Sequence, residues 1–147
     1  MMLQFYKMTG AGNDFVMVDN RDQMLSSVLT PGNIVDICDR RFGVGADGVI
    51  AVEAARCGGD VRMCHYGSDG AETGLSSDAA CCFAAFVDFL MDGDLRKICF
   101  ETSDGLAEGV VNDDDSVTIQ QTAPQQGPKQ SGQPFIVFRG EVIICEG

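Results

Sequence analysis

Seven cysteines and one histidine are the side chains of this sequence best suited to metal binding or nucleophilic chemistry. No two cysteines have the CxxC spacing, and His65 has no HxxxH or CxxC companion, so we predict no metal site. We expect free thiols, most of them buried as small apolar side chains. The cysteines stand at positions 38, 57, 64, 81, 82, 99 and 145.

Two glycine-rich segments are candidates for phosphate-binding loops, but neither has the neighbouring residues and elements that such a loop requires. Gly10–Asp14 lacks a third glycine and a following helix. Gly43–Gly48 precedes a strand-like run, which reverses the order of the dinucleotide-binding motif. The sequence also lacks a GxxxxGKS/T motif. We therefore interpret these glycines as turn residues and predict no nucleotide or other cofactor.

Composition and charge restrict the class of protein and its partners. The 147 residues fit one domain, and 45% apolar residues can form a core. Ten basic residues against 22 acidic ones give a net charge of −12, which argues against nucleic acid and anionic membranes as partners. No apolar stretch approaches the roughly 20 residues that span a bilayer. The N-terminal residues do not resemble a signal peptide, so we expect a cytoplasmic protein.

Two segments carry the signals of helices. Thr30 and Pro31 are a typical N-cap and first helical residue, and we expect Arg40 and Arg41 in the last turn of that helix. The second helix is predicted over residues 77–91, with an N-cap at its first or second residue and Gly93 as its stop. It is apolar on nearly every face, and such helices are normally buried in the centre of a fold.

Short β-prone runs fill most of the remaining sequence, and the last two are predicted to form a hairpin around Arg139 and Gly140. A proline- and glutamine-rich stretch, 123–134, is predicted to be a connector with little capacity to pack. We expect an α+β (mixed α/β) fold, in which a curled mixed sheet wraps around the central apolar helix. The predicted strands are 3–8, 14–19, 49–52, 61–66, 97–102, 106–111, 117–121, 135–138 and 141–145.

Four sequence blocks occur in an order that is similar to a known family. KMTGAGNDFVMVDN, CDRRFGVGADGVIAVE, MCHYGSDGAE and CFAAFV together resemble the N-terminal half of diaminopimelate epimerase, from about residue 4 to residue 122. The tail GQPFIVFRGEV resembles the family's extreme C-terminus, which returns to complete the first domain. The resemblance implies a single domain over 1–147, with 123–134 in the place of the second domain. Proline racemase and the phenazine-pathway isomerases are alternative parents, but the GNDFV and GADG blocks favour the epimerase.

The family implies a cofactor-independent isomerase that converts LL- to meso-diaminopimelate in lysine biosynthesis. Two cysteines, one from each domain, act as thiolate base and thiol acid. In ungapped register with the flanking blocks, the catalytic cysteine of the family falls on Ser76. The Gly-Asn that follows it falls on Ser77 and Asp78, and a substrate-contacting asparagine falls on Gly67. Asn13, another substrate contact of the family, is retained.

These replacements predict that the site does not function. A hydroxyl is far less acidic than a thiol of pKa about 8.5, so Ser76 supplies almost no base at neutral pH. Asp78 at a helix start repels a substrate carboxylate. Cys81, at the position of a family arginine, and Cys82 lie a turn or more into the helix, where we expect burial and a raised pKa.

Three hypotheses follow for function. In the first, the chain is an isolated, engineered and catalytically inactive half of the epimerase. In the second, a homodimer rebuilds a two-sided cleft and has weak isomerase activity. In the third, the chain is a small module that binds an amino acid near Asn13, Ser77 and Asp78, or binds a protein partner through its surface.

Overall fold

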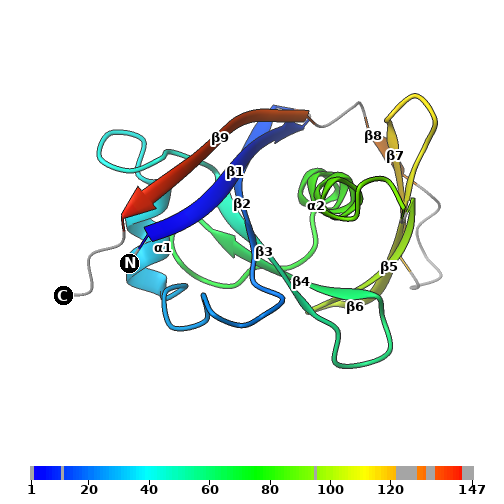
Figure 1. Cartoon of the computed structure of the whole chain (residues 1–147), viewed down its shortest axis with the longest axis horizontal. Coiled ribbons are helices and arrows are strands. Elements are labelled where there is room, and N and C mark those ends of the chain that lie inside the picture. Colours follow the sequence, from blue (N-terminus) through cyan, green and yellow to red (C-terminus); the bar gives the residue numbers. More distant parts are fainter. Residues whose placement is uncertain (1, 11, 95, 122–128, 132–134, 144–147) are drawn as a thin grey trace.

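The computed structural model describes residues 2–10, 12–94, 96–121, 129–131 and 135–143. The described strands form one nine-stranded sheet in the order β8-β7-β6-β5-β4-β3-β2-β1-β9, which curls around the helix α2, Ser77–Leu90 (Figure 1). This arrangement confirms the predicted fold class. The strands are β1 Met2–Gly10, β2 Asn13–Asp19, β3 Gly48–Ala54, β4 Val61–Gly67, β5 Lys97–Thr102, β6 Gly105–Val111, β7 Val117–Gln121, β8 Lys129–Ser131 and β9 Phe135–Ile143.

Strand direction follows from where the helices are inserted in the chain. The pairs β2–β3 and β4–β5 are parallel, and every other described pair is antiparallel. Parallel neighbours need a long crossover connection. The helix α1, Pro31–Cys38, lies in the first crossover and α2 lies in the second. The two helices therefore account for both parallel pairs.

Burial of α2 forms the larger of two apolar clusters. Alternate strand residues, among them Met17, Ile50 and Met63, point inward and pack with the buried residues of the helix. The rings of Phe83 and Phe100 lie 4.9 Å apart between centroids. Since the sheet covers the helix on most sides, the prediction of a central apolar helix is confirmed.

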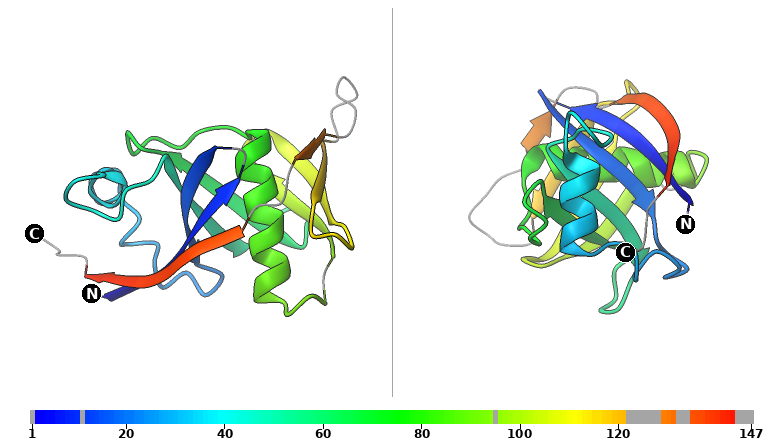
Figure 2. Two further views of the ribbon diagram at one scale, coloured as in Figure 1. Left: turned by 90° about the horizontal axis from the view of Figure 1, so that it is seen from above. Right: turned by 90° about the vertical axis from the view of Figure 1, so that its left-hand side faces the viewer.

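The smaller cluster packs α1 against the opposite face of the sheet (Figure 2). Ile34 and Ile37 contact outward-pointing residues of β2 and β3, and Thr30 is the N-cap, as predicted. The expectation that Arg40 and Arg41 lie in the last helical turn is wrong, because α1 ends at Cys38. The carboxylate of Asp39 accepts hydrogen bonds from the backbone N–H groups of residues 41 and 42, and this turn directs the chain away from the helix axis.

The C-terminal part of the described chain differs from the sequence prediction. The predicted hairpin around Arg139 and Gly140 is wrong, since both residues lie within one strand, β9, that pairs with β1. The whole length of β1 is available as a pairing edge, and Arg-Gly is not a strong two-residue turn. The strand β8 also falls inside the predicted connector, where it pairs with β7. The other residues of 123–134, and Cys145, lie outside the described residues.

The part of the chain that the structure describes lacks both a membrane-spanning helix and a metal-binding cluster. It contains no helix that is both long and apolar enough to cross a membrane. Within the same residues, no three histidine, cysteine or acidic side chains are grouped so that they would hold a metal ion.

Packing around α2 predicts a large cost for removing a central ring. Phe83→Ala is expected to lower the free energy of unfolding by about 3–5 kcal/mol, because the ring is fully buried and leaves a cavity. Urea unfolding followed by circular dichroism measures this difference. Phe42→Ala is the control, because Phe42 is 85% exposed, and its effect is expected to stay within about 0.5 kcal/mol. Equal effects of the two substitutions would contradict a buried central helix.

Candidate functional site

The start of α2 meets the start of β2, and this contact joins two of the predicted site residues. Asn13 Nδ2 donates a hydrogen bond to Asp78 Oδ2 at 2.5 Å, across 65 positions of sequence. Asn13 is the first residue of β2, and Asp78 lies in the first turn of α2. Both side chains are partly buried. The amide that the family resemblance assigns to substrate is therefore bonded to a carboxylate of the chain itself.

Ser76 is the N-cap of α2. Its Oγ accepts a hydrogen bond from the backbone N–H of Ala79 at 3.2 Å, and its own backbone is extended. The expectation that Ser77 or Asp78 caps the helix is wrong. An N-cap needs extended backbone and a side-chain oxygen that reaches the third helical residue, and Ser76 alone meets both conditions. Ser77 and Asp78 already lie inside the helix.

Two residues that the sequence analysis did not assign to the site hold the loop before α2. Asp104, in the turn between β5 and β6, accepts a hydrogen bond from the backbone N–H of Leu75 at 2.9 Å. The Nδ1 of His65 lies 3.2 Å from the carbonyl oxygen of Gly74. Burial lowers the pKa of His65, so the ring is neutral at pH 7. The Leu75–Asp104 contact spans 29 positions and the His65–Gly74 contact spans nine, and neither was predicted from the sequence.

A cluster of charges lies beside Asn13 and fixes the start of β2. The carboxylate of Asp14 lies 2.8 Å from the guanidinium of Arg40 and 2.9 Å from the ammonium of Lys7. It is bonded by Arg40 above all, and its pKa is held far below the usual value. Arg40 also reaches Asp47 at 3.1 Å. These contacts tie the loop after α1 to the β1–β2 hairpin and thereby place Asn13.

Gly67 ends β4, opposite Gly48 of β3. Its N–H donates to the carbonyl oxygen of Ala71, which closes the turn that follows. A Cβ built at this position would lie 3.0 Å from Oδ1 of Asp69, the end of a flexible side chain. The position can therefore accept a side chain after a small movement of Asp69. In this chain it contributes only backbone to the site.

The two cysteines of α2 are inside the core. Cys81 is 1% exposed and Cys82 is fully buried. Burial raises the pKa of the Cys82 thiol to about 12, with smaller contributions from Cys81 and Asp78. A thiolate forms only at a pH far above neutral in such surroundings. The expected burial of both cysteines is confirmed, as is the expected rise in the pKa of Cys82.

A family model described as diaminopimelate epimerase matches residues 5–126 of this chain. A diaminopimelate epimerase of Nitrosomonas eutropha is 37% identical over 131 residues, which cover 88% of this chain and 47% of the relative. One of Picosynechococcus is 42% identical over 93 residues, which cover 63% of this chain and 33% of the relative. The chain thus spans less than half the length of these relatives.

Solved structures of other isomerases have a similar fold at low sequence identity. A hydroxyproline epimerase of Agrobacterium vitis has a TM-score of 0.58 and 16% identity, with 80% of this chain and 41% of that chain covered. A methylitaconate-delta-isomerase has a TM-score of 0.61 and 12% identity, with 92% and 41% covered. These likenesses show that the curled sheet around a central helix is shared, and they extend to the fold alone.

The assignment of Ser76 as the N-cap of α2 can be tested by substitution. Ser76→Ala is expected to lower the free energy of unfolding by about 1 kcal/mol, because the N–H of Ala79 loses its acceptor. Chemical denaturation measures the change. Ser77→Ala is the matched control one position later, inside the helix, and its expected effect is within about 0.5 kcal/mol. A larger loss from Ser77→Ala than from Ser76→Ala would contradict the assigned cap.

The lowered pKa of Asp14 predicts that its contribution to stability depends on pH. A group with a lowered folded-state pKa stabilises above its unfolded value of about 3.9, and this stabilisation is lost as pH falls toward the folded value. The melting temperature of Asp14→Asn is therefore expected to lie well below that of the wild type at pH 7, with a smaller gap at pH 3. Asp113→Asn, in the exposed turn after β6, should show no such gap at either pH.

Proposed function

The chain belongs to the diaminopimelate epimerase family, and from this premise we propose that it is a catalytically silent, single-domain form of one half of such an enzyme. The observation that carries the proposal is the use of Ser76 Oγ as a helix cap, at the position where the family resemblance places a thiol.

Inversion of an amino-acid α-carbon has two chemical requirements. The α-proton is weakly acidic, so removing it needs a well-placed base and donors that stabilise the resulting carbanion. A second group on the opposite face must return a proton. Without a cofactor to absorb the charge, a thiolate is a suitable base because its pKa is close to the working pH.

Ser76 does not meet the first requirement. A hydroxyl has almost no anionic form at neutral pH unless a neighbouring base takes its proton. The Oγ of Ser76 accepts a hydrogen bond from the N–H of Ala79, which stabilises the helix end. The nearest thiols in sequence, Cys81 and Cys82, are buried in the core. Neither Ser76 nor these two buried thiols therefore supplies a base of suitable pKa.

Asp78 opposes substrate binding at the same place. Helix N-termini attract carboxylates through their unpaired N–H groups and the helix dipole. Here the carboxylate of Asp78 lies in the first helical turn and accepts the hydrogen bond from Asn13. A carboxylate of a substrate would meet a like charge and an amide that is already bonded. These are also the replacements that deliberate inactivation would use, which favours an engineered origin.

The pairing of the last strands supports a single domain over 1–147. Both β8 and β9 join the same sheet as the strands that precede them, on opposite edges. In the chain, the stretch 123–134 runs between β7 and β9 of this sheet, and its described part, β8, is itself a strand of the sheet, which supports the proposed connector in place of a second domain. A homodimer would present two copies of Ser76 across a cleft, and we expect such a dimer to be inactive for the same reason.

Absence of turnover is directly measurable by isotope exchange. The protein is incubated with LL- and meso-diaminopimelate in deuterated water, and α-deuterium is measured by mass spectrometry. We expect no incorporation above the rate without protein, because neither face of the α-carbon meets a base. A full-length diaminopimelate epimerase in the same buffer is the positive control. Exchange that depends on this protein would overturn the proposal.

A restoration experiment tests whether the parent geometry is retained. Ser76→Cys, Gly67→Asn and Asp78→Asn are combined and mixed with a separately made second domain of a family member. We expect racemisation in the mixture and none with either part alone. The variant with Gly67→Asn and Asp78→Asn, but with Ser76 unchanged, is the matched control and should stay inactive with the same second domain. Activity of this control would contradict the role given to position 76.

A further inference from the structure

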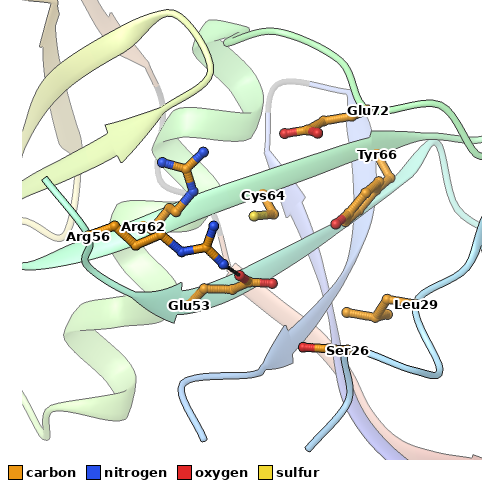
Figure 3. A pocket seen from close by; sticks show the side chains of 8 residues that line it. All are labelled: Ser26, Leu29, Glu53, Arg56, Arg62, Cys64, Tyr66 and Glu72. Carbon is orange, nitrogen blue, oxygen red and sulfur yellow. Dashed lines mark ion pairs between the residues drawn. The ribbon is translucent and has the colours of Figure 1, made fainter. Parts of the chain in front are cut away.

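A polar pocket lies on the face of the sheet that is opposite α2. It has a volume of about 270 Å³ and opens between β3, β4 and the segment that leads to α1 (Figure 3). Arg62, Cys64 and Tyr66 alternate along β4 and line it together, whereas Met63, between them, points into the core around α2. The sheet therefore separates this pocket from the Asn13–Asp78 contact.

Two guanidinium groups on one side of the pocket have unused hydrogen-bonding capacity. Arg56 lies 3.7 Å from Glu53 and Arg62 lies 3.8 Å from Glu101, distances beyond that of a hydrogen bond. Glu101 already accepts hydrogen bonds from three backbone N–H groups, those of residues 56, 57 and 59. These three bonds use much of the acceptor capacity of the Glu101 carboxylate. Arg62 therefore keeps N–H donors for another acceptor.

Acceptor groups lie on the other sides of the same pocket. The carboxylate of Glu72 and the hydroxyl of Tyr66 lie across from the two arginines, with Cys64 between them (Figure 3). Burial, with the nearby Cys64 and the carboxylates of Glu53 and Glu72, raises the pKa of Tyr66 to about 12, so the hydroxyl keeps its proton at neutral pH. Glu53 is buried and oriented by a 3.1 Å hydrogen bond from Asn20.

We propose that this pocket binds a small zwitterion of the α-amino acid class. The carboxylate of the ligand would be held by Arg56 and Arg62, and its ammonium group by Glu72 and the hydroxyl of Tyr66. Two arginines and two glutamates give the lining no net charge, so a ligand with both charges matches it better than a simple anion or cation. The volume lies just below the roughly 300–1,000 Å³ of drug-sized pockets, which limits the ligand to a small metabolite.

The test is a titration of the ¹⁵N-labelled chain with glycine and L-alanine, followed by NMR. We expect saturable shifts at the backbone amides of Cys64, Tyr66 and Glu72, with those of Asn13 and Asp78 unchanged. Acetate and methylammonium, each carrying one of the two charges, should bind roughly tenfold more weakly or worse, because each loses one set of charged hydrogen bonds.

Two variants and two matched controls assign the contacts. Arg56→Gln and Glu72→Gln change exposed side chains and are each expected to weaken binding at least about tenfold. Lys97→Gln and Glu108→Gln make the same charge changes on β5 and β6 and should leave binding unchanged. Thermal melting of all four checks that the fold is retained.

Several results would overturn the proposal. These are the absence of saturable shifts with either amino acid, equal binding of acetate and L-alanine, and unchanged binding in Arg56→Gln and Glu72→Gln. Shifts centred on Asn13 and Asp78 would also overturn it, because they would place the ligand at the start of α2. Isotope exchange is a separate measurement. Failure of the proposal that the chain is catalytically silent can therefore be distinguished from failure of this one.

Discussion

Burial of one apolar helix is the constraint on which the rest of this molecule depends. Because α2 has almost no polar face, water must be excluded from nearly its whole circumference, and a flat sheet can cover only one side. The sheet curls, its inward residues form the larger cluster, and the helix ends are left at the rims of the curl. The polar residues at the start of α2 occupy such a rim, so the position of the candidate site follows from packing.

At that rim, the polar side chains form hydrogen bonds within the chain itself. Ser76 satisfies an N–H of the helix, and the Asn13–Asp78 contact satisfies an amide and a carboxylate together. Each bond occupies a donor or an acceptor at the start of α2. The Asp14 cluster and Asp104 hold the neighbouring loops in the same way. The start of α2 is thus held by hydrogen bonds to its own backbone, to β2 and to the turn between β5 and β6.

The two faces of the sheet consequently differ in chemistry. The inner face is filled by α2 and is apolar up to the rim. The outer face is covered by α1 over only part of its area, and the uncovered part of β3 and β4 carries charged side chains of both signs. Long ion pairs there leave donors available, in contrast to the closed hydrogen bonds at the start of α2. The pocket proposed to bind an amino acid therefore lies on the face that the family resemblance does not point to.

The sequence by itself determined the local elements, because caps, turns and apolar periodicity act within a few residues of one another. Thr30 and Pro31 start α1 as predicted, and strands 97–102 and 117–121 have the predicted bounds. Only the tertiary structure decided the contacts between distant segments. Asn13 forms a hydrogen bond with Asp78, and Arg40 lies beyond the end of α1 and pairs with Asp14. Gly140 continues a strand because β1 offers a free edge for pairing. Such contacts depend on how the sheet closes around α2, and no short stretch of sequence contains that information.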